Sequence, residues 1–161
     1  MDIGFYIIWN KHSVKSKGNV VGDELFAESL CKSINKQFKS INAELYAPNY
    51  LPKKKLDALI YLNESAPNEK LSKYHFLYIQ NGCEENIDII INKSIALGYD
   101  GHIFFSEIIK NLFDKKKQPR KNSLYLPFGV DLDHFSPRQR ENRFTFDCAF
   151  IGNDIKGPES A

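Results

Sequence analysis

The sequence predicts an α/β fold in which helices flank a mostly parallel sheet, and three observations lead to this prediction. Short apolar runs alternate with longer amphipathic segments along the 161 residues. The run at 3–9 is apolar and aromatic throughout, as expected for a central strand covered on both faces. Strands separated by helical segments need crossover connections, which give parallel pairing with helices on the sheet faces.

Composition and charge narrow the class of protein. Hydrophobic residues make up 42% of the chain and aromatic residues 13%, which is typical of a globular domain. The net charge of +2 arises from scattered residues of both signs and indicates no special attraction to nucleic acid or membrane. No apolar run approaches the roughly 20 residues of a membrane span, and the first residues lack the basic region of a signal peptide. We therefore expect a cytoplasmic protein without a transmembrane segment.

The cysteines indicate neither a disulfide framework nor a metal site. Cys31, Cys83 and Cys148 are odd in number, widely spaced, and have no histidine at ligand spacing. Small, partly buried thiols are the expected outcome.

The predicted strands are short and end at turn-forming residues. They cover residues 3–9, 43–47, 56–62, 75–80, 102–105, 123–126 and 146–151. Pro48 and Pro127 end two of them because proline lacks the N–H group that a sheet requires.

Three longer segments and one short one predict helices. The first has Asp23 and Glu24 in its opening turn, where the helix dipole favours anions, and a stripe every four residues at Phe26, Leu30, Ile34 and Phe38, with Leu25 alongside. Residues 84–97 are β-branched enough to form a strand, but acids at the start, isoleucines at helical spacing and Gly98 as a stop favour a helix. Ser106 is expected to cap a helix through Lys117, with inward residues Ile108, Ile109, Leu112 and Phe113. Pro67 after Ser65 predicts a short helix between two strands.

Several nucleotide-binding and hydrolytic classes lose their support because their motifs are missing. The loop at 10–23 does not match the GxGxxG dinucleotide fingerprint, and the chain contains neither the GxxxxGK[ST] phosphate loop nor the GxSxG nucleophile elbow. A Rossmann-like arrangement by itself does not define a function.

Two segments near the end of the chain carry a resemblance to a known class. Residues 125–137, Tyr-Leu-Pro-Phe-Gly-Val-Asp-Leu-Asp-His-Phe-Ser-Pro, look like the P-x-G-V-D-x-x-x-F-x-P segment that closes the N-terminal domain of many two-Rossmann-domain (GT-B) glycosyltransferases. Residues 146–153, Phe-Asp-Cys-Ala-Phe-Ile-Gly-Asn, resemble the first strand and glycine turn of their second domain. The helix at 22–30 is similar to their opening helix, and the continuation at 153–159 narrows the resemblance to the spore-maturation-protein-like glycosyltransferases.

The resemblance implies an organisation and an activity. It divides the chain into a Rossmann-like acceptor-side domain at 1–137, an interdomain linker at 138–145, and the start of a truncated donor-binding domain at 146–161. The implied reaction moves a sugar from a nucleotide-sugar to an acceptor hydroxyl, in surface-polysaccharide or glycan synthesis. Gly152 and Asn153 would lie near the donor diphosphate. The nucleotide-sugar is a co-substrate, no further cofactor is implied, and no metal is expected because the class generally needs none and no DxD motif is present.

Ligands bind at the carboxyl ends of parallel strands, and this rule places the loops at 10–22, 63–65, 80–82 and 106–107 at the acceptor site. The general base of an inverting transfer would be one of His12, Asp23 and Glu107, each of which also has a plain structural interpretation as a loop residue or first-turn acid. Substrate-binding candidates in the same loops are Asn10, Gly22, Gln80, Asn81 and Ser106. His75 and His102 are expected to be structural.

Two other classes of function remain open from the sequence. One is a stand-alone Rossmann-like or flavodoxin-like binding or regulatory module, which would have no need of the strand ending in Gly152 and Asn153. The other is a scaffold role in a polysaccharide-synthesis complex. In the glycosyltransferase interpretation, the partners are the sugar nucleotide, a glycan or other hydroxyl acceptor and the missing C-terminal domain. This chain alone is expected to be inactive, and the core surface left exposed favours self-association.

Overall fold

The structure is a computed structural model that describes residues 1–12, 22–80, 87–116 and 122–129. All of them belong to one compact unit, Met1–Gly129. The predicted domain boundaries at 137 and 145 and the predicted strand at 146–151 lie outside the described residues, as do Cys83, Cys148, Asn81, Gly152 and Asn153.

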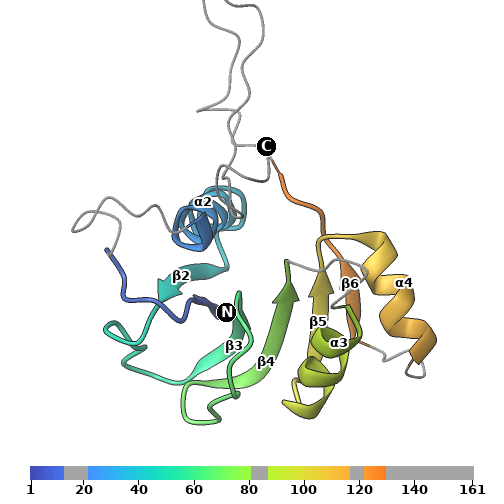
Figure 1. Ribbon diagram of the computed structural model, residues 1–161. Helices are drawn as coiled ribbons and strands as arrows, with labels where there is room; N and C mark the ends of the chain where they lie inside the picture. Colours follow the sequence, from blue (N-terminus) through green and yellow to red (C-terminus); the bar gives the residue numbers. More distant parts are fainter. Residues whose placement is uncertain (13–21, 81–86, 117–121, 130–161) are drawn as a thin grey trace, which may run out of the picture. The chain divides into compact units, whose positions relative to one another are not determined.

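Six parallel strands form one sheet in the order β2-β1-β3-β4-β5-β6, which confirms the predicted α/β class (Figure 1). The strands are β1 (Asp2–Tyr6), β2 (Asn42–Tyr46), β3 (Leu56–Tyr61), β4 (Ser72–Ile79), β5 (Gly101–Phe104) and β6 (Ser123–Tyr125). The helices are α2 (Gly22–Gln37), α3 (Ile87–Ala96) and α4 (Glu107–Lys116).

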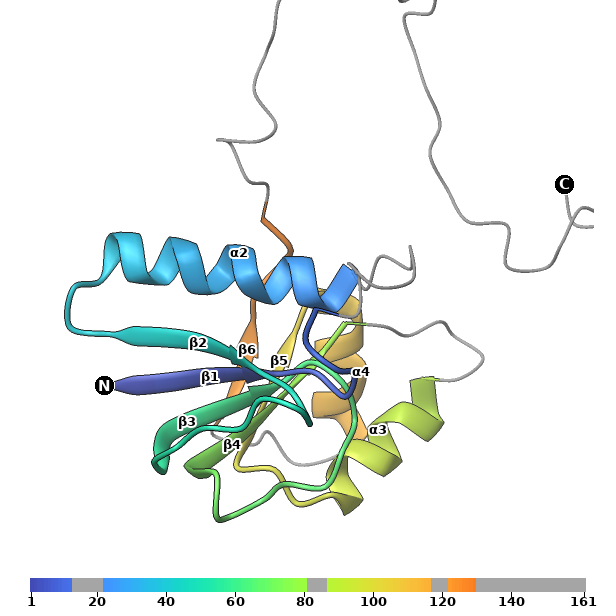
Figure 2. The same cartoon turned by 90° about the vertical axis from the view of Figure 1, so that its left-hand side faces the viewer.

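The helices cover opposite faces of the sheet. Figure 2 shows α2 on one face, with α3 and α4 on the other. Packing agrees, because Ala27 and Cys31 of α2 form a cluster with Phe5 of β1 and Leu45 of β2. Successive side chains of a strand point to opposite faces of the sheet, so the neighbours of Phe5 and Leu45 face α3 and α4. Burial among these groups raises the pKa of the Cys31 thiol to about 12, so the thiol stays protonated.

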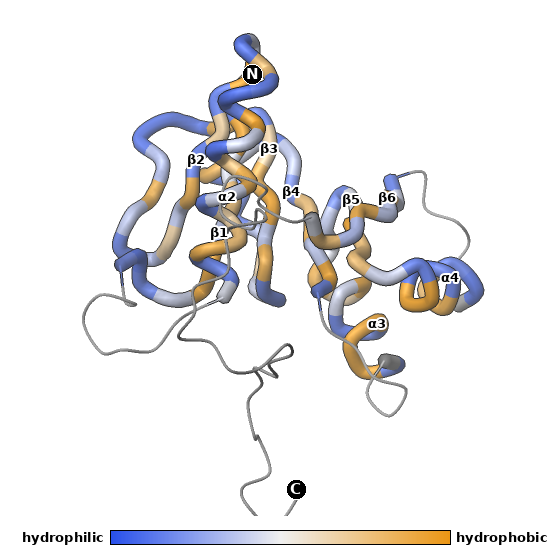
Figure 3. The backbone as a smooth tube through the Cα atoms, turned by 90° about the horizontal axis from the view of Figure 1, so that it is seen from above, coloured by the Kyte–Doolittle hydropathy of each residue, from blue (hydrophilic) through white to orange (hydrophobic). Residues whose placement is uncertain are grey.

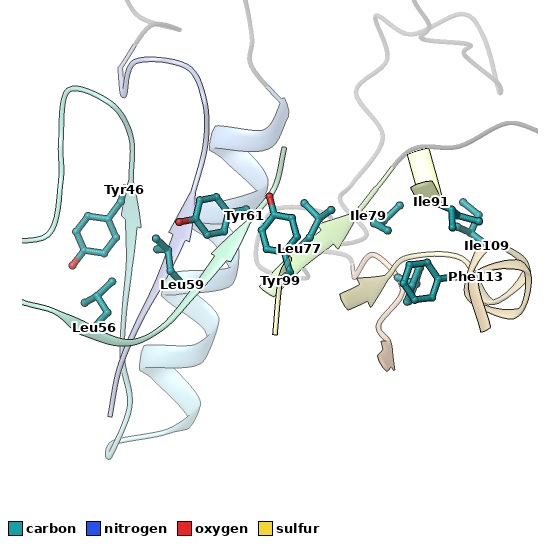
Figure 4. Close-up of a cluster of buried hydrophobic side chains, with 11 residues drawn as sticks. Tyr46, Leu56, Leu59, Tyr61, Leu77, Ile79, Ile91, Tyr99, Ile109 and Phe113 are labelled. Atoms are coloured by element: carbon teal, nitrogen blue, oxygen red, sulfur yellow. The ribbon is translucent and has the colours of Figure 1, made fainter. Parts of the chain in front are cut away.

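The larger cluster lies between the sheet and helices α3 and α4, and its side chains form a band across the sheet (Figure 4). Its central residues are fully buried aromatic and aliphatic side chains: Leu59, Tyr61, Leu77, Ile91, Phe104 and Phe113. Hydrophobic residues accordingly concentrate along the strands and α3, whereas α4 has one hydrophobic and one hydrophilic side (Figure 3). These buried positions match the apolar runs from which the strands were predicted.

The first strand is shorter than predicted. Pairing ends at Tyr6, opposite Tyr46 of β2 and Tyr61 of β3, although backbone N–H groups of Ile7 and Leu62 still donate to neighbouring carbonyls. Ile8 and Trp9 therefore leave the sheet and are 40% and 52% exposed. Apolar character predicted a strand to residue 9, but both neighbouring strands stop earlier, and the chain has no partner to continue with.

The predicted ends and faces of the helices are partly right. Gly98 has φ of 75°, as expected for a left-handed stop after α3. Phe38 lies beyond the end of α2 and is 51% exposed, so it does not extend the buried stripe, and Leu25 is 49% exposed. Ile108 was predicted to face inward with Ile109, but it is 73% exposed because only Ile109, Leu112 and Phe113 lie on the side of α4 that meets the sheet.

The predicted short helix at Ser65 and Pro67 is wrong. The connection from β3 to β4 crosses without helical structure. Side-chain hydroxyls satisfy its backbone instead: Tyr61 Oη accepts a hydrogen bond from the Asn68 N–H at 3.1 Å, and Tyr99 Oη accepts one from the Ser65 N–H at 3.1 Å while donating to the Ser65 carbonyl. Two buried tyrosines thus take the place of helical hydrogen bonds.

No helix among the described residues is long and apolar enough to cross a membrane.

Candidate functional site

The candidate site lies at the carboxyl ends of the central strands. The chain runs from β1 outward to β2 and then back across β1 to β3, from which the later strands proceed in the other direction. Such a reversal leaves a crevice beyond the carboxyl ends of β1 and β3, where ligands bind in open parallel sheets. The first turn of α2 opens at this same edge, because α2 follows the loop after β1.

Asp23 is the centre of a polar cluster in this crevice. Its Oδ2 accepts a hydrogen bond from Asn63 Nδ2 at 2.8 Å, and its Oδ1 lies 3.4 Å from Gln80 Nε2. Gln80 Nε2 also donates to the Leu62 carbonyl at 2.8 Å, and Asn63 Oδ1 lies 3.4 Å from the Ile8 N–H. Three elements therefore fix one carboxylate: α2 carries it, and the ends of β3 and β4 hold it through carboxamides.

A hollow of about 380 Å³ adjoins the cluster. Its polar lining comes from Asn63, Glu64, Gln80 and Lys93, and the Lys93 ammonium forms a 2.8 Å ion pair with Glu64. Ile8, Leu77, Ile79 and Ile90 supply apolar walls. A hydroxylated molecule of modest size would find both hydrogen-bonding groups and apolar contacts here.

Two of the base candidates lie away from this cluster. His12 is exposed in the loop after β1, and its backbone, at φ of 67°, donates a 2.6 Å hydrogen bond to Glu24 Oε1. Glu107 is exposed at the start of α4, beyond β5, two strands further along the sheet than β3. Only Asp23, of the three candidates, joins a hydrogen-bonded cluster in the crevice.

Glu24 has an environment that the sequence did not predict. It is 3% exposed, and its Oε2 has no hydrogen-bond partner within the part of the chain that the structure describes. The acid beside it in sequence, Asp23, faces the crevice instead. Two adjacent first-turn acids thus have different roles, one turned toward the protein interior and one toward the ligand edge.

The remaining substrate-binding candidates have structural positions. Gly22 begins α2, and a Cβ at this position would meet nothing within 4 Å. Asn10 is exposed in the loop after β1. Ser106 caps α4 as predicted, since its Oγ lies 3.5 Å from the Ile109 N–H and its carbonyl accepts from the Lys110 N–H. Gln80 is the one that contacts Asp23 directly.

The two strand histidines are buried toward the opposite edge of the sheet, in keeping with the structural role expected of them. His75 Nδ1 lies 3.3 Å from the Tyr61 hydroxyl and 3.1 Å from Ser72 Oγ, and burial lowers the pKa of the ring. His102 packs against Phe113 with ring centroids 4.7 Å apart. Neither histidine lines the crevice.

Sequence reasoning placed the loop at 63–65 near the site but did not single out Asn63, Glu64 or Lys93. A signal for Asn63 was present, because it directly follows an apolar run predicted to end at residue 62. Lys93 gave no such signal, since a lysine on the exposed side of an amphipathic helix is the usual pattern.

Comparison of the chain with protein-family models, with curated proteins and with solved structures finds no match.

Proposed function

We propose that the chain is the acceptor-binding part of a glycosyltransferase that uses a nucleotide-sugar donor. The observation that carries the proposal is the Asp23 carboxylate, held by two carboxamides at the crevice beside a hollow of about 380 Å³. The resemblance of residues 125–137 and 146–153 to GT-B glycosyltransferases supplies the reaction class, with Gly152 and Asn153 near the donor diphosphate.

Asp23 fits the role of the group that receives the acceptor hydroxyl. In an inverting transfer, this oxygen attacks the anomeric carbon of the donor while its proton passes to a carboxylate, and the nucleoside diphosphate leaves with the electrons of the broken bond. Asn63 and Gln80 fix the carboxylate's position, which favours transfer because a base must lie within hydrogen-bond reach of the proton. Glu64 and Lys93 would contact further hydroxyl groups of the acceptor.

A non-catalytic binding module is the second candidate, and one observation favours it. Both oxygens of Asp23 already lie near amide donors, an arrangement that can hold a hydroxylated ligand without any proton transfer. The two candidates share a ligand class and differ in whether a bond is made.

The test is turnover of a mixed UDP-, GDP- and TDP-sugar panel by the longest polypeptide that contains this chain, with released nucleotide as the readout. Asp23→Asn keeps the shape of the side chain and should abolish most nucleotide release that depends on acceptor. The matched control is Asp57→Asn, an exposed aspartate near the amino end of β3. Acceptor binding without any turnover, in a folded protein, would favour the binding module over the transferase.

A further inference from the structure

A second hollow opens at the same edge of the sheet and is mostly apolar. It measures about 370 Å³ and lies between the β2–β3 and β3–β4 connections. Its walls are the aromatic rings of Tyr6 and Tyr61 and the aliphatic side chains of Ile8, Pro48, Leu51 and Leu71. Such a lining binds alkyl or aromatic groups rather than a fully hydroxylated ring.

The apolar hollow adjoins the polar one. Ile8 lines both, and consecutive residues of the β3–β4 connection divide between them: Asn63 and Glu64 line the polar hollow, whereas Ser65 and Ala66 line the apolar one. The two hollows are therefore close enough for one ligand to place its head in one and its tail in the other.

The apolar hollow is rigidly built, although loops form two of its sides. The Tyr6 and Tyr61 rings pack with centroids 5.4 Å apart at an angle of 54°, and Tyr61 and Tyr99 hold the β3–β4 connection through its backbone. Asn49 Oδ1 accepts a hydrogen bond from the Lys11 N–H at 2.8 Å and so ties the β2–β3 connection to the loop after β1. A preformed hollow binds a ligand with little loss of conformational entropy.

Two further observations indicate that a ligand belongs here. Ile8, Trp9 and Leu51 are large apolar side chains that are 40%, 52% and 49% exposed at this one edge, and such clusters mark binding surfaces. Ser65, whose residue lines the apolar hollow, has a buried Oγ that forms no hydrogen bond of ordinary geometry within the described segments. Ser65 lines the apolar hollow and directly follows Glu64, which lines the polar one.

We infer that the apolar hollow binds the alkyl chain or aromatic ring of an amphiphilic acceptor, whose hydroxylated head lies in the polar hollow by Asp23. Ser65 Oγ donates a hydrogen bond to the oxygen that links head and tail. The position of the head rests on the proposed function, whereas the tail site depends only on the hollow itself.

The experiment uses the full chain and two probes with the same head, octyl β-D-glucopyranoside below its micelle concentration and methyl β-D-glucopyranoside. Trp9 is the only tryptophan in the sequence and adjoins Ile8, so its emission reports on this edge of the sheet alone. The octyl probe should bind at least about tenfold more tightly, since each buried methylene contributes roughly fourfold in affinity. Equal affinity of the two probes would overturn the inference.

Three variants localise the binding. Leu51→Asp should weaken octyl-probe binding about tenfold or more, because it places a charge in the apolar hollow. Leu25→Asp is the matched control, as Leu25 is also 49% exposed but lies on α2 and lines neither hollow. Leu124→Asp probes a different hollow, of about 640 Å³, on the sheet face at β3–β6, and should leave the Trp9 response unchanged. A response lost in Leu124→Asp but kept in Leu51→Asp would assign the octyl chain to that other hollow.

Ser65→Ala tests the junction. It should weaken binding of the octyl probe roughly fivefold, the usual effect of losing one hydrogen bond. The denaturation midpoint should fall little, because the hydroxyl forms no hydrogen bond of ordinary geometry in the described segments of the unliganded protein. An unchanged affinity would remove Ser65 from the site.

The outcomes separate this inference from the proposed function. Tight, Leu51-dependent binding of the octyl probe, together with no sugar transfer by the longest polypeptide that contains this chain, would leave the tail site standing and remove the transferase proposal. Sugar transfer that proceeds equally well to methyl and octyl acceptors would establish the transferase and overturn the amphiphilic acceptor.

Discussion

The two edges of the sheet carry similar polar residues but use them differently. At the amino edge, Ser72 Oγ donates to the Tyr74 carbonyl and contacts His75, and Asp100 accepts the His75 N–H at 2.7 Å. At the carboxyl edge, Asp23 and Gln80 meet each other beside an open hollow. Polar groups that bond to the backbone beside them stabilise the fold, whereas groups that hold one another at a hollow keep capacity for a ligand.

The glycines show the same difference. A Cβ on Gly101, at the start of β5, would lie 2.6 Å from the Asn122 carbonyl oxygen and 2.9 Å from the Phe76 ring. A Cβ on Gly22, at the start of α2, would meet nothing within 4 Å. The start of β5 is tightly packed, whereas the start of α2 has room for a side chain.

The largest effect is expected at the carboxyl edge, where one substitution should reduce activity strongly and stability very little. Asp23→Asn should lower sugar transfer by about a hundredfold or more, the usual range for loss of a general base. Its free energy of unfolding should change by less than about 1 kcal/mol, because the amide oxygen can still accept from Asn63 Nδ2 and only the long 3.4 Å contact with Gln80 is lost. Chemical denaturation beside a nucleotide-release assay measures both, and a large loss of stability would make Asp23 a structural residue.

The next largest effect is expected on the free energy of unfolding, when one glycine at each edge is replaced by alanine. Gly101→Ala should lower the free energy of unfolding by about 1–3 kcal/mol, since the added methyl group forces a backbone shift. Gly22→Ala should leave it unchanged or raise it by about 0.4–1 kcal/mol, because the helix gains a better former in open space. Urea denaturation of the two variants decides, and equal losses would contradict the contrast between the edges.

The smallest effect is a pH dependence that arises at the amino edge. Burial lowers the pKa of His75, although Asp100 and Glu69 oppose the shift, so the folded state holds the ring neutral where the unfolded chain already binds a proton. The free energy of unfolding should therefore fall as the pH drops below about 6.5, by at most about 1.4 kcal/mol per pH unit from this group. Urea midpoints at about pH 7.5 and about pH 5.5 test this, and His75→Gln should show a smaller pH dependence if His75 causes it.

Local sequence patterns predicted the fold because burial is periodic in it. The alternation of short apolar runs with amphipathic segments predicted the strands, and Gly98 and Ser106 predicted two helix ends. These signals act within a few residues of their own position. The short helix at Ser65 was wrong because its competitor is Tyr99, a hydroxyl 34 positions away that bonds to the same backbone. Contacts of that range leave no mark in a local pattern.

The site was predicted only in part for a similar reason. Asp23 and Gln80 follow from the rule for strand ends, but their contact with each other and the bond from Asn63 to Asp23 depend on the order of the strands in the sheet. Glu24 was indistinguishable from Asp23 in sequence, and only the direction of each side chain separates the buried acid from the one at the crevice.

The connection that crosses from β3 to β4 should exchange its amide hydrogens unlike an ordinary loop. The Ser65 and Asn68 amides donate to the hydroxyls of Tyr99 and Tyr61, two rings that are 3% and 1% exposed. Deuterium can enter these two amides only when the buried rings move away, an opening that costs much of the global free energy of unfolding. In a hydrogen-exchange experiment, these isolated amides should stay protonated about as long as those of the neighbouring strands. Exchange at these two amides would therefore report on the β3–β4 connection beside the two hollows without an added label.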